Sequence, residues 1–289
     1  MDLPASVTAL GEQLRGAADL VPDPALFQSA DVFAAERERI FIRPWMAVDH
    51  ETRLSENGRY FRFEAATRSV LVTRDEEGRL RALRNVCIHA GYPVCDAEEG
   101  PAKRLICPYH GWEYTLDGRL VEPALTRIDP ARLWLTSYPI CVRNGLIFVD
   151  PSRKTEAFEE SFNSLPAWLA DARVTRRARY NTTWNWKFVH HFLRSSLHLF
   201  FDAAPDSCLE FGPLSLLIVR SHQAALLRVI PKFAEQTDFQ VIQMIAADGP
   251  EETAAASDAV AEGLRGTDTS HCWFDRRFGD WYWSLMSAT

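Results

Sequence analysis

The sequence predicts an α+β protein, in which a small all-β domain precedes an antiparallel sheet gripped by helices. Between residues 41 and 151, short apolar runs alternate with turn sequences such as Glu56-Asn57-Gly58, which is typical of short strands joined by tight turns. After residue 213, further apolar runs have the length of strands and are followed by a segment with helical spacing. The two textures predict two different domains.

The elements follow in chain order. The N-terminal segment contains one amphipathic helix over residues 5–20 and another over 24–40, with Asp31 as the N-cap of its later part. A further helix begins near Asn185, and the aromatic tail after residue 272 packs back on the core. The predicted divisions are a helical segment (1–40), an all-β domain (41–151), a helical connector (152–175) and a sheet domain (176–289). In the sheet domain, the predicted strands are 214–219, 225–230 and 239–246, and the predicted last helix is 250–264.

Composition limits the function. The 289 residues are 47% hydrophobic and 25% charged, which is usual for a globular protein, and the net charge of −7 argues against a nucleic-acid partner. The sequence has no run of about 18 apolar residues and no secretory signal pattern, so we expect neither a membrane span nor export. The six cysteines follow no disulfide framework, which favours reduced thiols in the cytoplasm.

The most informative motif consists of two Cys/His pairs. Cys87 and His89 are separated by one residue, and Cys107 and His110 by two. This is the ligand pattern of a Rieske [2Fe–2S] cluster, in which two thiolates hold one iron and two imidazoles hold the other. A zinc ion also accepts two cysteines and two histidines, but common zinc spacings pair Cys with Cys and His with His. We therefore expect a one-electron carrier.

The second pair continues as Cys107-Pro108-Tyr109-His110-Gly111-Trp112. This string resembles the Rieske non-heme iron oxygenases, the family of the aromatic-ring-hydroxylating dioxygenase alpha subunits. Respiratory Rieske proteins carry disulfide-bonded cysteines at the positions of Tyr92 and Tyr109, so the resemblance is to the oxygenase type. Trp112 is expected to shield the cluster, and Ala90 stands where the family commonly has arginine.

The resemblance implies that the second domain is a shortened helix-grip domain (START/Bet v 1-like) with a mononuclear Fe(II) held by two histidines and one carboxylate. Asn185-Trp186-Lys187 matches the opening of the helix that carries the histidines. His198 then stands where the first iron histidine belongs, and Asn185 and His198 are the candidate catalytic residues. The second histidine is expected at the position of Ala203, and the family's bridging aspartate at that of Ser195.

The mononuclear iron site therefore looks degenerate. The expected late carboxylate falls near Ser257, next to Asp258. Asp202 follows His198 by four residues and would share its helical face. Either the chain holds no mononuclear iron, or an altered site built from His198, Asp202 and Asp258 holds it.

Three functions are open. In the first, the chain is an oxygenase subunit whose cluster carries electrons from a reductase or ferredoxin to the Fe(II) of a homologous partner subunit. The two subunits would belong to one trimer or hexamer. The reaction would be O₂-dependent hydroxylation of an apolar or aromatic molecule, as in aromatic hydrocarbon catabolism. In the second, the chain is a self-sufficient oxygenase with altered iron ligands. In the third, it is a stand-alone electron carrier or sensor with a ligand cavity.

The remaining notable side chains are expected to be structural. His190, His222 and His271 have no partner at ligand spacing, so each is expected to be a surface or hydrogen-bonded histidine, as is His50. The tryptophans of the tail are expected to be core residues. The basic run over residues 173–179 is expected to be a solvated face, with docking of an acidic ferredoxin as the alternative.

Overall fold

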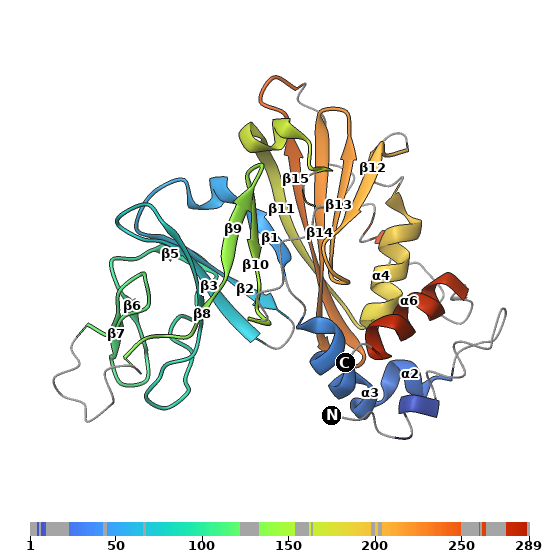
Figure 1. Ribbon diagram of the computed structural model, residues 1–289, viewed down its shortest axis with the longest axis horizontal. Helices are drawn as coiled ribbons and strands as arrows, with labels where there is room; N and C mark the ends of the chain where they lie inside the picture. The colour runs from blue at the N-terminus through green and yellow to red at the C-terminus, as the bar shows by residue number, and fades with distance from the viewer. Residues whose placement is uncertain are drawn as a thin grey trace. The chain divides into compact units, whose positions relative to one another are not determined.

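The computed structural model describes residues 5, 7–9, 23–42, 45–65, 68–121, 133–153, 162, 164–197, 200–201, 204–249, 260, 262–263 and 276–287. The chain divides into two compact units. One unit is Pro44–Asp171, and the other combines Met1–Arg43 with Ala172–Thr289. The N-terminal helices thus belong to the same unit as the C-terminal half (Figure 1). No helix in the described parts of the chain is long and apolar enough to cross a bilayer.

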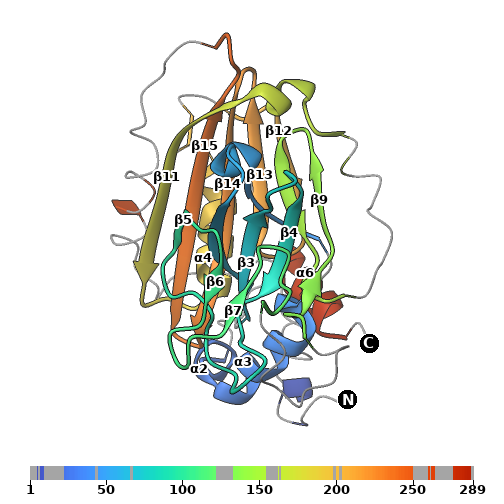
Figure 2. The ribbon, with the colours of Figure 1, turned by 90° about the vertical axis from the view of Figure 1, so that its left-hand side faces the viewer.

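The unit Pro44–Asp171 is built from antiparallel sheets, as the alternating apolar runs predict. Its three sheets have the strand orders β1-β10-β9, β5-β2-β3-β4-β8 and β6-β7. Figure 2 shows β3 beside β4 in the second of these sheets. The elements are β1 (Met46–His50), η2 (Glu51–Leu54), β2 (Arg59–Ala65), β3 (Arg68–Arg74), β4 (Leu80–Arg84), β5 (Glu99–Pro101), β6 (Leu105–Ile106), β7 (Glu113–Tyr114), β8 (Ser137–Tyr138), β9 (Ile140–Arg143), β10 (Leu146–Val149) and η6 (Ala167–Asp171).

The turn between β9 and β10 packs closely against His50 at the end of β1. Asn144 and Gly145 both have positive φ, 45° and 74°, as a tight hairpin turn with the twist of its strands requires. A Cβ on Gly145 would lie 2.2 Å from Nε2 of His50. The His50 ring is buried and bonds the Leu169 carbonyl through Nε2 at 2.8 Å, so the prediction of a hydrogen-bonded histidine is confirmed.

The second unit is a sheet covered by helices. Its strands have the order β11-β15-β14-β13-β12, and α4 packs against β14 and β15 on one face of the sheet (Figure 1). The predicted strands after residue 213 are confirmed. The elements are α2 (Ala25–Gln28), α3 (Ala30–Glu36), η1 (Arg37–Phe41), β11 (Arg173–Thr182), α4 (Trp186–Ser195), β12 (Ser207–Glu210), β13 (Ser215–Arg220), β14 (Gln223–Phe233), β15 (Gln236–Ile245) and α6 (Arg276–Ser287).

One sequence prediction for this unit is corrected, and another is confirmed. The predicted helix over residues 24–40 is interrupted at Ser29, whose hydroxyl accepts from the Val32 amide, so Ser29 is the N-cap and Asp31 lies in the first turn. The aromatic tail ends in a helix, α6, which buries Tyr282 and Trp283 in the core as expected. Most of the helices predicted over residues 5–20 and 250–264 lie outside the described residues.

A buried carboxylate joins three helices of this unit. Glu36, at the end of α3, accepts from the Trp186 Nε1–H at 2.7 Å, from the Tyr282 hydroxyl at 2.6 Å and from the Lys187 ammonium. Lys187 is completely buried, and burial lowers its pKa. The Trp-Lys dipeptide of the predicted motif therefore fixes the start of α4 against α3 and α6.

Candidate functional site

The two Cys/His pairs lie on two loops with the same local structure. In each loop the cysteine amide donates to a carbonyl five residues ahead, that of Tyr92 for Cys87 and that of Trp112 for Cys107. In each loop a glycine amide donates back to the cysteine carbonyl at 2.9 Å. These glycines, Gly91 and Gly111, have φ of 75° and 71°, a conformation that other residues rarely adopt.

The loops separate the sulfur ligands from the nitrogen ligands. The Cys87 and Cys107 side chains are buried, and burial together with the neighbouring Cys87 thiol raises the pKa of the Cys107 thiol. His89 and His110 are exposed, with ring centroids 4.7 Å apart. The site therefore has a buried pair of thiols and a solvent-facing pair of imidazoles.

Aromatic side chains support both loops. The Trp112 ring stacks on the His89 ring with centroids 4.6 Å apart and planes 7° apart. Tyr92 of the first loop stacks on Tyr109 of the second at 5.1 Å. We call this last contact the tyrosine stack. The two ligand loops therefore hold each other in place, and Trp112 covers one face of the His89 ring.

A buried tyrosine also contacts the sulfur side of the site. The Tyr114 hydroxyl lies 3.1 Å from Cys87 Sγ and accepts from the Ile88 amide at 3.3 Å. Burial raises the pKa of Tyr114, so its hydroxyl stays protonated. When Cys87 is a thiolate that holds iron, its sulfur has no proton to donate, so the hydroxyl would be the donor in this contact. The sequence does not reveal this contact, because it depends on how β7 packs under the first loop.

The donor set fits a two-iron cluster better than a single ion. Among the described residues, no group of three or more His, Cys, Asp and Glu side chains surrounds one position. A structural zinc needs four ligands on one centre, whereas each iron of a Rieske cluster takes two protein ligands. Cys87 and Cys107 would hold the inner iron, and His89 and His110 the outer one.

The described structure does not include the proposed mononuclear iron residues. His198, Asp202, Ala203 and Asp258 lie outside the described residues. Asn185, the other catalytic candidate, is the N-cap of α4. Its side chain accepts from the Lys187 amide and donates to the carbonyls of Phe27 and Ala234.

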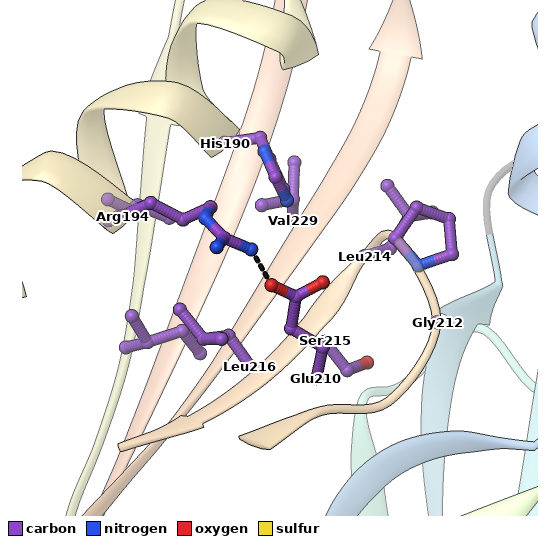
Figure 3. Close-up of a pocket in the computed structure, with 11 residues that line it drawn as sticks. His190, Arg194, Glu210, Gly212, Leu214, Ser215, Leu216 and Val229 are labelled. Atoms are coloured by element: carbon purple, nitrogen blue, oxygen red, sulfur yellow. Dashed lines mark ion pairs between the residues drawn. The ribbon is translucent and has the colours of Figure 1, made fainter. Parts of the chain in front are cut away.

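A cavity of about 330 Å³ lies beside α4. A smaller pocket, of about 10 Å³, continues from His190 toward β13 and β14 (Figure 3). His190 lines both, and its imidazole lies flat against Trp281 with centroids 4.6 Å apart. We call the larger space the α4 cavity. Its lining residues are His190, His191, Arg194, Ser195, Glu210, Phe278 and Trp281.

His190 corrects a sequence prediction. The sequence predicts a surface or hydrogen-bonded histidine, but its side chain is buried and Nδ1 has no hydrogen-bond partner among the residues that the structure describes. Burial, and then the nearby Arg194 and His191, lower its pKa to about 3, so the imidazole is neutral. The sequence around His190 does not predict its burial, because the Trp281 ring that covers it belongs to α6, which is distant in the sequence. His222 is exposed as predicted, and His271 lies outside the described residues.

Comparison with known proteins identifies the class of the site. Residues 44–139 match the Rieske [2Fe–2S] domain family. Residues 44–139 therefore form a Rieske [2Fe–2S] domain, and the chain is similar in sequence to the oxygenase subunits of Rieske oxygenases. The recognition of the Cys/His motif is confirmed, as is the α+β fold class.

Individual relatives show how far the likeness extends. The chain is 28% identical to the glycine betaine monooxygenase oxygenase subunit of Chromohalobacter salexigens, over 62% of this chain and 42% of that protein. It is 36% identical to the chlorobenzene dioxygenase subunit alpha of a Cupriavidus strain, over 35% of this chain and 22% of that protein. The chain thus spans less than half the length of these curated relatives.

A solved structure extends the likeness in fold to the whole chain. The quaternary ammonium Rieske monooxygenase CntA, in complex with L-carnitine, superposes with a TM-score of 0.70 at 19% identity and covers 99% of this chain and 98% of that one. At this identity the match shows a common fold. The described parts of this chain therefore share the fold of that Rieske monooxygenase.

Proposed function

We propose that the chain is an electron-carrying subunit of a Rieske oxygenase, whose cluster serves the mononuclear Fe(II) of a homologous partner subunit. The observation that carries this proposal is a contrast within the chain. All four cluster ligands are present on two well-formed loops, whereas Ala203 and Ser195 stand where the family's second iron histidine and bridging aspartate belong. The chain therefore has the ligands for electron transfer but lacks residues that the family uses for O₂ chemistry.

The arrangement of the ligands supports this role. When bound, a [2Fe–2S] cluster takes up and gives out one electron at a time. The buried thiols of Cys87 and Cys107 keep water from the inner side. The exposed imidazoles of His89 and His110 bring the outer side to the protein surface, where a reductase, a ferredoxin or a neighbouring subunit can make contact. The free thiols of Cys95, Cys141 and Cys208 are compatible with a cytoplasmic setting.

The relatives suggest two substrate classes. One group is named for glycine betaine and choline, and another for benzene and chlorobenzene. The expectation of aromatic hydrocarbon catabolism is therefore one of two alternatives. We assign the reaction only as O₂-dependent oxidation of a small organic molecule at the partner's iron.

The test is a count of iron and acid-labile sulfide per chain in anaerobically purified protein, together with low-temperature EPR of the reduced state. We expect two irons and two sulfides per chain. His198→Ala should leave both numbers unchanged, and Cys107→Ser should remove both irons.

Other results would change the assignment. A third iron that is lost in His198→Ala would show that the chain carries its own iron centre, built on the alternative set of His198, Asp202 and Asp258. Hydroxylation by the isolated chain with a reductase and O₂ would lead to the same conclusion. A colourless protein that binds zinc would remove the basis of the proposal.

A further inference from the structure

The first ligand loop, residues 85–95, has no pair of strands to close it, in contrast to the second. The second loop lies between β6 and β7, which pair with each other. The first loop follows β4, but the next strand along the chain, β5, pairs with β2 instead. Backbone hydrogen bonds close only its inner part, residues 87–92. The two ends of the first loop must therefore be joined by other contacts.

The side chain of Asn85 makes this join. Its Oδ1 accepts from the amides of Val94 and Cys95, each at 2.9 Å. Its Nδ2 donates to the Cys95 carbonyl at 2.8 Å and to the Ser69 hydroxyl oxygen on β3 at 3.1 Å. The backbone amide of Asn85 also donates to the Ser69 carbonyl at 3.0 Å. One residue therefore connects the start of the loop to its end and attaches both to β3.

These contacts use the full hydrogen-bonding capacity of the Asn85 carboxamide. A carboxamide has two N–H donors and an oxygen that accepts twice, and all four are engaged here. The partners also fix the orientation of the group, because exchanging Oδ1 and Nδ2 would set N–H against N–H and oxygen against a carbonyl. Asn85 is 2% exposed, so water does not compete for these bonds. An ionised aspartate would keep the acceptor and lose both donors.

The closed loop presents its two ligands in different surroundings. Val94, whose amide Asn85 holds, is buried in the same core cluster as Cys87 and Cys107. Closure of the loop thus fastens its sulfur ligand to the core. His89 lies in the middle of the loop and is exposed. Its position therefore depends more on how the loop is closed than on burial.

We propose that Asn85 is a positioning residue of the cluster, which closes the first loop so that Cys87 is presented to the inner iron and His89 to the outer one. Asn85 acts through the loop and not as a ligand. This inference rests on the cluster of the proposed function and not on the partner's iron. Loss of the closure should displace His89, while His110 in the second loop keeps its place.

Two variants of the full-length protein with its cluster test the proposal. Asn85→Ala removes all four side-chain bonds, and Asn85→Asp removes the two that the amide donates. We expect release of iron to a chelator to be about tenfold faster in Asn85→Ala than in the wild-type protein, with Asn85→Asp in between. Pulsed EPR of the reduced cluster should show a changed coupling at one of the two ligand histidines, while the coupling at the other keeps its wild-type value.

Asn144→Ala is the matched control for a general loss of stability. The Asn144 side chain donates to the carbonyls of Leu165 and Pro166 in the same unit, and to neither ligand loop. This variant should lower the free energy of unfolding and leave both histidine couplings unchanged.

Three results would overturn the proposal: wild-type release rates and couplings in both Asn85 variants, equal changes of coupling at both histidines, or the same change in Asn144→Ala. If Asn85→Ala assembles no cluster, Asn85→Asp decides, because wild-type behaviour of that variant would overturn the proposal as well. Failure here leaves the count of two irons per chain untouched. Conversely, a third iron in the wild-type protein would overturn the proposed function without changing these comparisons.

Discussion

At the scale of single residues, the contact between Tyr114 and Cys87 should raise the reduction potential of the cluster. A hydroxyl that donates to a ligand sulfur stabilises the more negative, reduced state. If the hydrogen bond strengthens by about 1.4 kcal/mol on reduction, the potential is about 59 mV higher than without it.

Tyr114→Phe removes only the hydroxyl, so we expect its reduction potential to be about 59 mV lower, measured by EPR-monitored redox titration. Tyr138→Phe on β8 is the control and should leave the potential unchanged. A Tyr114→Phe potential equal to that of the wild-type protein would show that the 3.1 Å contact does not stabilise the reduced cluster.

His190 should make the protein sensitive to mild acid. Its pKa is about 3 in the folded chain and about 6.5 when unfolded. Between these values the unfolded state binds more protons, so the free energy of unfolding falls as pH falls below about 6.5. From pH 6.5 to 5.0 the loss should be about 1.6 kcal/mol, and it should be absent from His190→Phe. Urea unfolding at both pH values measures it, and equal slopes for the two proteins would contradict it.

Residue by residue, the sequence predicts what depends on local spacing. Cys87, His89, Cys107 and His110 are recognisable because each pair lies within one loop. The tyrosine stack, the Tyr114 contact and the buried state of His190 are not, because each depends on a partner from another loop or helix. Ser29 rather than Asp31 caps α3, although both residue types are common N-caps. The extended backbone at Ser29, where the helix predicted over residues 24–40 is interrupted, makes Ser29 the cap.

At the scale of elements, the Glu36 carboxylate is the joint between α3, α4 and α6. Glu36→Gln would leave the Lys187 ammonium buried without a counter-charge, which typically costs about 3–5 kcal/mol. Urea unfolding should show a loss of that order. Glu38→Gln, two residues along in η1, is the matched control. Its side chain is 66% exposed, so we expect a change within about 0.5 kcal/mol. Similar losses of unfolding free energy in both variants would show that Glu36 does not stabilise the packing of α3, α4 and α6.

The sheet order shows why elements were easier to predict than their assembly. The strands of β13, β14 and β15 follow from apolar runs between turns. The place of β11 beside β15 does not follow, because its partner is some sixty residues away (Arg179 pairs with Gln240) and its alternating pattern is only half-buried.

At the scale of the whole molecule, the two units should respond differently to loss of iron. The cluster ligands all lie in Pro44–Asp171, and a metal that binds the folded state contributes its binding free energy to folding. After anaerobic removal of iron by a chelator, we expect faster amide hydrogen exchange in this unit and little change in Ala172–Thr289. Equal acceleration in both units would show that they unfold together.

The tyrosine stack has a consequence for the conditions that the site tolerates. Respiratory Rieske proteins link the corresponding loops by a disulfide, which thiol reductants can cleave. Here two aromatic rings, 5.1 Å apart, fasten the loops by packing alone. Glutathione or dithiothreitol has no disulfide to reduce between Tyr92 and Tyr109, so the tyrosine stack should persist under reducing conditions.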